Sequence, residues 1–290
     1  MTVGAGPGLV PPAHPLWRVH RERVLLLGAG RALLLQLAHP LVAAGVAEHS
    51  RFTEDPLGRL RRTLAPMYAL VFGDAARRAA AAGRLEAVHA RVRGRLRAAV
   101  GPFAAGTPYD AADPALRLWV HATLVDSALA THARFVGPLD ADTRARYYAG
   151  TRALGRAVGV PDEWLPATLE DFTRWMAGEL AGETLTVGPD ARAAAAAVLR
   201  PRAPLLRLPM PLVALVTAGM LPPRLRAAYG LPWSRGRAVV LATLAGAIRV
   251  LRPALPAPLR LVPEARRAER AARVTAAVPA TASRPSAPGT

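Results

Sequence analysis

Histidine is the residue with the widest range of chemistry in this chain, and all seven histidines lie before residue 133. Neutral imidazole ligates transition metals, and its titration near neutral pH suits proton transfer. Cysteine is absent, which excludes thiolate ligands, cysteine nucleophiles and disulfides. A metal or redox centre would therefore take its nitrogen ligands from the first half of the chain.

His89 is the first candidate for such a ligand. A helix is predicted from about Ala75, after the capping residue Asp74, to about Val100. Its apolar residues recur at helical spacing on one face: Leu85, Val88, Val92 and Leu96. His89 falls in the middle of that face and is predicted to point inward, where it would be able to ligate a metal. A lone inward histidine is more often a hydrogen-bonded core residue, so the residues alone leave both roles open.

The longest apolar run extends from Val24 to Ser50, yet it contains the polar residues Arg31, Gln36, His39, Glu48 and His49. Because polar groups are costly to bury without partners, the run is either a nucleotide-binding strand and turn or a core helix lining a polar pocket. Gly28 and Gly30 suggest the first, but Leu33 occupies the third glycine position of that motif, and no βαβ alternation follows. The glycines are instead expected to allow close approach of a neighbouring helix or a cofactor.

Pro40 divides this run. It lacks a backbone N–H and disfavours helical geometry at His39, so two helices with a kink or break between them are predicted. His39 would then lie where backbone groups are freed, as a candidate pocket wall, with His49 near the exit of the pocket.

The sequence gives little support for a hydrolytic site and more for a haem site. There is no H-E-x-x-H motif, and Ser50, Ser127 and Ser234 lack the context of a nucleophile elbow. A haem needs an axial nitrogen from a helix, an apolar pocket for the porphyrin and cations for its propionates. His89, the Leu/Val/Ala faces of the helices and the arginines around Arg59 could supply all three.

The composition predicts an all-α fold. Hydrophobic residues make up 52% of the 290 residues, and isoleucine occurs once, at Ile248, so β-branched residues are scarce while helix formers dominate. We expect a flexible N-terminal lead-in over residues 1–15, a single large multi-helix catalytic domain with a buried haem-type pocket over 16–275, and a disordered tail over 276–290.

Cap-and-proline signals predict where several helices begin. Asp55-Pro56 should open a helix toward Phe72, and Asp113-Pro114 should open one toward Phe135. Asp140 should cap a helix toward Gly159, and Thr168 with Asp171 resembles a capping box. Shorter helices are expected over 190–199, 212–220, 223–229, 234–251 and 264–274.

The net charge of +18 raises the question of a nucleic-acid partner. All 38 basic residues are arginine, with no lysine, and they are spread along the chain, which indicates compositional bias more than a phosphate-binding stripe. Specific nucleic-acid binding is therefore not expected, whereas peripheral contact with an anionic membrane is compatible with the charge. No signal peptide or clean transmembrane segment is found, so a cytoplasmic location is expected.

Several ordered motifs resemble a known family. They are RALLLQLAHPLVAAGVAEHSRF, DPLGRLRRT, FGD, VHARVRG and YDAADPALRLWVHATLVDS. Together they are similar to the bacterial oxygenase family of the latex clearing protein, a rubber oxygenase, which also includes the oxygenase of the fungal mycophenolic-acid pathway. The resemblance extends over roughly residues 17–270. It implies an all-α fold, a b-type haem, and oxidative cleavage of isoprenoid double bonds with dioxygen.

The resemblance also implies roles for individual residues. His89 would be the proximal iron ligand, and Arg59 and Thr63, four residues apart on one helical face, would be the haem-pocket pair. His39 and His49 belong to the shared pattern as possible cofactor contacts. The latex enzyme has a lysine just before the threonine, but this chain has Arg62, which stays protonated and does not coordinate iron.

No counterpart of that enzyme's catalytic glutamate is identified, although Glu48 is near in the sequence. A small lipophilic or terpenoid alkene is therefore expected as the substrate, together with dioxygen, in place of rubber. The alternative is a non-catalytic helical protein that binds a lipophilic ligand without haem.

Overall fold

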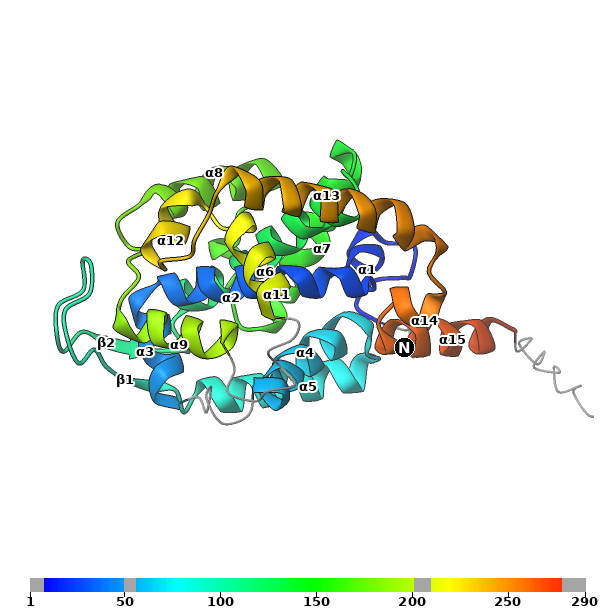
Figure 1. Ribbon diagram of the computed structural model, residues 1–290. Helices are drawn as coiled ribbons and strands as arrows, with labels where there is room; N and C mark the ends of the chain where they lie inside the picture. Colours follow the sequence, from blue (N-terminus) through cyan, green and yellow to red (C-terminus); the bar gives the residue numbers. More distant parts are fainter. Residues whose placement is uncertain (1–7, 50–55, 201–209, 278–290) are drawn as a thin grey trace, which may run out of the picture.

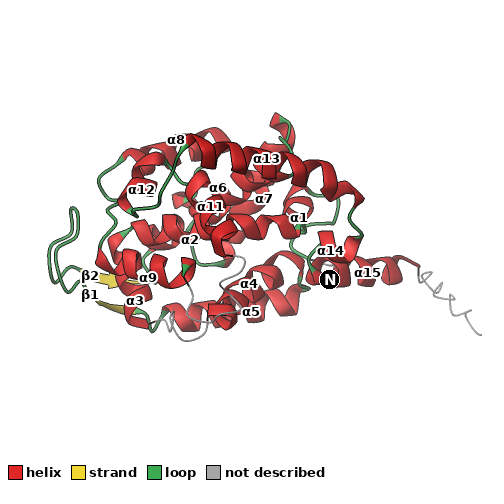
Figure 2. Cartoon of the chain, in the orientation of Figure 1, coloured by secondary structure: helices red, strands yellow, loops and turns green. Residues whose placement is uncertain are grey.

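The computed structural model describes residues 8–49, 56–200 and 210–277, and within these ranges the chain is helical apart from one short β-hairpin (Figures 1 and 2). The predicted all-α class is confirmed, with the elements forming a single domain. The predicted cap at Asp55, the residue Ser50 and most of the expected C-terminal tail lie outside the described residues.

Helix α2, Ala29–Ala38, lies at the centre of the fold, preceded by the 3-10 turn η1, Arg23–Gly28 (Figure 1). It packs against α6 (Pro114–Phe135), α9 (Pro189–Leu199) and α11 (Met210–Met220). A helix covered on so many sides is apolar nearly all round, which explains the long hydrophobic run. The nucleotide-binding alternative is excluded because this run forms helices, with no strand before the glycines.

The two glycines of this run let neighbouring helices approach closely, as expected. A Cβ on Gly28 would collide with the Thr131 side chain of α6, and one on Gly30 would collide with the Thr217 side chain of α11. Both threonines are fully buried and short, so neither can swing away. The glycines therefore set the spacing between α2 and its neighbours.

We expect Gly30→Ala to lower the free energy of unfolding by about 2 kcal/mol, because the added methyl overpacks the contact with Thr217. Gly83→Ala is the matched control: Gly83 is exposed in a helix and a Cβ there meets nothing within 4 Å. That change should stabilise the protein by about 1 kcal/mol through helix propensity. Urea unfolding of both variants measures the difference, and equal effects at the two positions would contradict the packing argument.

The predicted break at Pro40 is confirmed. Helix α3, Pro40–His49, follows α2 directly, and the segment Arg23–Ala38 meets it at an angle of 106°. No described helix has by itself the length and apolar character needed to cross a membrane, and this bent pair meets those two criteria only in combination.

Helices α4 (Pro56–Phe72) and α5 (Ala75–His89) form an antiparallel pair below α2 in Figure 1. The chain turns at Gly73, and the Asp74 side chain caps α5 by accepting from the Arg77 N–H at 2.8 Å. Both features were predicted.

The prediction that α5 continues to Val100 is wrong, because the helix ends at His89. The chain instead forms β1 (Arg93–Arg95), which pairs antiparallel with β2 (Pro108–Asp110). Gly94 lies against the Tyr109 ring, where a Cβ would come within 2.7 Å of Cζ, so a contact distant in sequence overrides the helical spacing. Val88 is 57% exposed and does not belong to an inward face.

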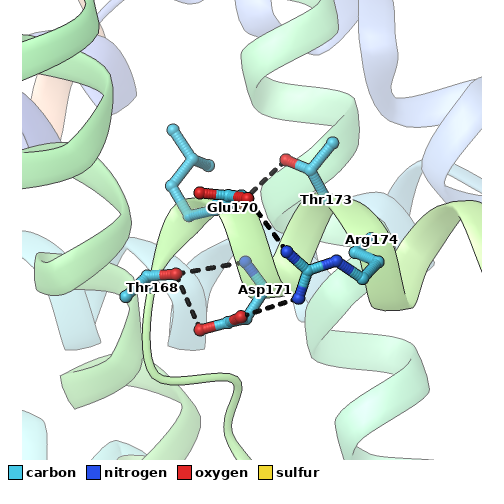
Figure 3. Close-up of polar contacts among 6 residues, drawn as sticks. Thr168, Glu170, Asp171, Thr173 and Arg174 are labelled. Carbon is cyan, nitrogen blue, oxygen red and sulfur yellow. Dashed lines mark hydrogen bonds and ion pairs between the residues drawn. The ribbon is translucent and has the colours of Figure 1, made fainter.

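Three further helix starts follow their predicted caps. Asp113 and Asp140 each accept a backbone N–H at the start of α6 and of α7, Ala141–Ala157. The 3-10 turn η2, Asp162–Trp164, then leads to α8, Leu169–Ala181. Figure 3 shows the N-terminus of α8, where Thr168 Oγ1 accepts from the Asp171 N–H and donates to the Asp171 carboxylate at 2.7 Å.

The C-terminal helices complete the cover of the molecule. They are α12 (Pro223–Ala228), α13 (Arg235–Leu251), the 3-10 turn η3 (Arg252–Ala254), α14 (Ala257–Arg260) and α15 (Pro263–Ala277). Helix α13 packs on α11 and α6, as seen at the top of Figure 1.

The C-terminal part of the chain then contacts the N-terminal helix α1 (Pro15–His20). The Val262 N–H donates to the Arg21 carbonyl at 2.8 Å, directly after α1. The indole of the fully buried Trp17 donates to Glu269 of α15 at 3.0 Å.

Candidate functional site

The α4–α5 pair carries three of the five residues expected to contact a cofactor. Arg59 and His89 each lie about 15 residues from the turn at Gly73, one before it and one after it. Because both helices rise by about 1.5 Å per residue, the two positions lie at the same end of the pair. Thr63 lies one helical turn nearer to the connection, and its side chain is exposed. The Arg59 side chain lies outside the described residues, so its role stays a prediction.

His89 is the last residue of α5 and is half-buried. Its Nδ1 atom is buried and has no hydrogen-bond partner among the described residues. Burial lowers the pKa of His89, the nearby Arg117 guanidinium lowers it further, and Glu86 acts in the opposite direction. The imidazole is therefore neutral near pH 7, which is the form that ligates a metal.

Arg117 ties the end of α5 to α6 beside this histidine. Its side chain is 8% exposed and forms an ion pair with Glu86 at 2.9 Å. It also donates to the carbonyls of Ala111 at 3.1 Å and Gly159 at 3.4 Å. A guanidinium with three separate acceptors is held firmly, so it fixes the last turn of α5.

Apolar side chains from α3, the β-hairpin and α6 gather next to this turn. The buried members of the cluster are Leu41, Ala44, Leu96, Tyr109 and Leu116. Val92, three residues after His89, packs on the same cluster and faces Gly45 of α3, where a Cβ would lie 3.3 Å from its side chain. The connection from α5 to β1 is thus the place where α3, α5 and the hairpin meet.

His49 lies at the end of α3 on this connection, and its side chain is exposed. Its Nε2 atom is 3.3 Å from the Arg93 carbonyl oxygen and 3.4 Å from the Tyr109 hydroxyl. That hydroxyl donates to Glu48 at 2.5 Å, and burial together with this bond raises the pKa of Tyr109. Glu48, His49 and Tyr109 form one polar group, which we call the α3 polar group.

His39 lies at the other end of α3, and the α3 polar group does not include it. It is buried at the break between α2 and α3, with its ring centroid 5.4 Å from that of Phe103. Burial lowers its pKa to about 4, although Asp113 acts in the opposite direction, and its Nδ1 has no partner among the described residues. The ten residues of α3 separate His39 from His49 by about 14 Å along the helix axis.

The His89 end of the α4–α5 pair fits a haem in one respect. Among the described residues, no three His, Asp or Glu side chains come together as a metal site, so iron bound by His89 would need its other ligands from a macrocycle. A half-buried neutral imidazole with an unpartnered nitrogen is suited to that axial position.

Sequence reasoning missed Arg117 and Tyr109. Arg117 gave no signal, because its partners Glu86 and Gly159 come from elements that only tertiary folding brings together. Tyr109 was visible as an aromatic residue between Pro108 and Asp110, but its contact with Glu48 depends on a hairpin whose first strand was predicted as helix.

Comparison with known proteins supplies the family. The chain is 28% identical to the uncharacterized proteins Mb2261 of Mycobacterium bovis and Rv2237 of Mycobacterium tuberculosis over 211 residues, which is 71% of this chain and 80% of each relative. No solved structure is detectably similar. The catalytic-domain family described as ER-bound oxygenase mpaB/B'/Rubber oxygenase matches residues 17–252, which confirms the resemblance seen in the motifs. The chain therefore belongs to the mpaB and rubber oxygenase catalytic-domain family.

Proposed function

We propose that this oxygenase-family protein binds haem b through His89 and uses dioxygen to oxygenate or cleave a small lipophilic alkene. The observation that carries the proposal is the neutral, half-buried His89 with an unpartnered Nδ1 at the end of α5. Membership of an oxygenase family supports the reaction class. When bound, the haem would supply the iron at which dioxygen is activated.

The chain's own residues would position the cofactor. Arg117, through its bonds to Glu86 and two backbone carbonyls, holds the last turn of α5 and thereby the direction of the His89 ring. We assign Arg59 to a haem propionate and Thr63 to orienting the haem or the bound oxygen. Arg62, next to Thr63, carries a guanidinium, which would not ligate the iron.

Absorption spectroscopy of the purified protein tests the haem. The protein, as isolated or after addition of haemin, is expected to show a Soret band, and His89→Ala should lose it because the axial nitrogen is gone. His14→Asn is the control, since His14 caps α1 next to Gly150 of α7 and asparagine is a favoured capping residue. A colourless protein that takes up no haemin would overturn the proposal and favour the non-catalytic binding of a lipophilic ligand.

The proposed location and partners follow from the sequence. We retain a cytoplasmic location as a prediction from the sequence, in which no signal peptide was found, and peripheral contact with anionic membranes as a prediction from the +18 charge. A lipophilic substrate partitions into membranes, so such contact would bring the enzyme to its substrate.

A further inference from the structure

A cavity of about 380 Å³ lies at the opposite end of the chain's fold from His89 and shares no residue with the candidate oxygenase site. Its walls come from α1 and the turn after it, the connection between α6 and α7, η3 and α14. The volume falls within the range of small-molecule pockets, about 300–1,000 Å³. Six residues with ionisable side chains line it: Arg18, Arg21, Glu22, His132, Arg252 and Arg260.

The arginines that line the cavity carry more positive charge than the nearby carboxylates neutralise. Buried Glu22 pairs with Arg252 at 3.0 Å, and Glu269 pairs with Arg21 at 3.2 Å. Arg18 and Arg260 have no acidic partner among the described residues. Two of the four guanidinium charges therefore remain unbalanced around one cavity, which favours a ligand with about two negative charges.

Hydrogen-bond donors are left over as well. The Nε atoms of Arg21, Arg252 and Arg260 are all buried and have no protein acceptor among the described residues. Each is therefore a buried donor that the described part of the protein leaves unsatisfied, which is uncommon in folded proteins. Guanidinium groups match the oxygens of phosphate in geometry and in charge.

His132 adds a further polar group on the α6 side. Its Nδ1 lies 3.0 Å from the Gly137 carbonyl, so that nitrogen donates to the backbone and fixes the ring. Burial is the main cause that lowers its pKa, and the charges of Arg252 and Arg18 add to it. Arg18 of α1 and Arg252 of η3 thus both place positive charge near the His132 ring.

We propose that this cavity binds a phosphate monoester dianion, supplied either by a soluble phosphorylated compound or by a lipid head group. The charge excess of two and the arginine lining suit a dianion with several oxygens better than a single carboxylate. A lipid source is compatible with the exposed Leu251, Leu255 and Leu259, which neighbour Arg252 and Arg260 along the chain. The proposal does not depend on haem or on the oxygenase reaction.

Titration calorimetry with glycerol 3-phosphate and sedimentation with vesicles test the two sources. The vesicles are phosphatidylcholine alone, or with phosphatidic acid, or with phosphatidylserine, which is anionic but has no phosphate monoester. We expect binding of glycerol 3-phosphate or of phosphatidic acid vesicles above phosphatidylserine vesicles. Binding of the soluble probe alone identifies a soluble ligand, and binding of the phosphatidic acid vesicles alone identifies a lipid head group.

Matched variants separate the cavity from general surface charge. Arg260→Gln should weaken binding about tenfold or more, as expected for loss of a charge-assisted hydrogen bond. Arg235→Gln removes the same charge from an exposed position on α13 and should leave binding unchanged. If Arg260→Gln fails to fold, Arg18→Gln at an exposed position replaces it. No binding of any probe, or equal loss in the cavity and control variants, would overturn the proposal.

Discussion

Acidification from pH 6.5 to pH 4 is expected to lower the free energy of unfolding by about 3 kcal/mol or more through two histidines in the core. His121 of α6 is buried and His20 of α1 is half-buried beneath Tyr147, whose hydroxyl lies 3.1 Å from the His20 Nε2. Burial lowers the pKa of both histidines from 6.5 to about 4, and the charge of His20 acts further on His121.

The direction of this pH dependence follows from how many protons the folded and the unfolded states bind. Between pH 6.5 and pH 4 the unfolded chain protonates both imidazoles, while the folded protein keeps them neutral. The unfolded state then binds more protons, so stability falls as the pH falls through this window. A shift of about 2.5 pKa units corresponds to about 3 kcal/mol for a fully buried group. His121 should contribute more to this loss of stability than His20, because the His20 side chain is partly exposed.

Urea unfolding at several pH values checks this expectation. His121→Asn should flatten the dependence on pH, because asparagine does not titrate. Tyr147→Phe is the control: it loses the hydrogen bond to His20 but keeps both imidazoles, so it should lower stability and preserve most of the slope. A slope that stays the same in His121→Asn would show that other groups, such as carboxylates that protonate and no longer balance the many arginines, cause the acid sensitivity.

Arg31→Ala is expected to lower the free energy of unfolding by about 3 kcal/mol, the second large effect. Arg31 is part of α2, and its buried side chain bonds to residues of two other helices, α6 and α11. It forms an ion pair with Asp126 at 2.6 Å and donates to the Ser127 hydroxyl at 2.8 Å, both on α6. It also donates to the Met220 carbonyl at the end of α11 at 2.8 Å. Its removal leaves a largely buried carboxylate, a hydroxyl and a carbonyl without their partner.

The matched control is Arg146→Ala. Arg146 pairs with Asp142 at 2.9 Å, but both side chains are more than half exposed, so its loss should cost less than about 0.5 kcal/mol. Thermal and urea unfolding of the two variants give the comparison. Similar effects at both positions would refute the role of Arg31 as a buried link between α2, α6 and α11.

Local interactions made much of the fold predictable. Each helix cap binds a backbone N–H within three residues, so a short stretch of sequence is enough to predict it. This holds for the caps at Asp74, Asp113, Asp140 and Thr168. The break at Pro40 is local for the same reason. The helical class followed from composition, and the family followed from motifs that covered most of the chain.

Contacts between distant residues were not predictable in the same way. The apolar spacing from Leu85 to Leu96 suggested one long helix, but pairing of Gly94 with Tyr109 ends the helical region near His89. The fixing of the last turn of α5 by Arg117 also depends on how α5 and α6 meet. His89 was predicted as a candidate from its residue type and from the resemblance, and its role stays a prediction, whereas its surroundings required the three-dimensional structure.

The return of α15 to α1 affects the order in which the protein can fold. Trp17 is fully buried, and its indole donates to Glu269, a residue synthesised some 250 positions later. A nascent chain emerges from its N-terminus, so the first helix is exposed throughout synthesis and gains its final cover only at the end. Contacts this distant in sequence slow folding because a long loop must close first. Helix α1 leaves the ribosome well before α15 and is thus among the last segments to reach its native surroundings.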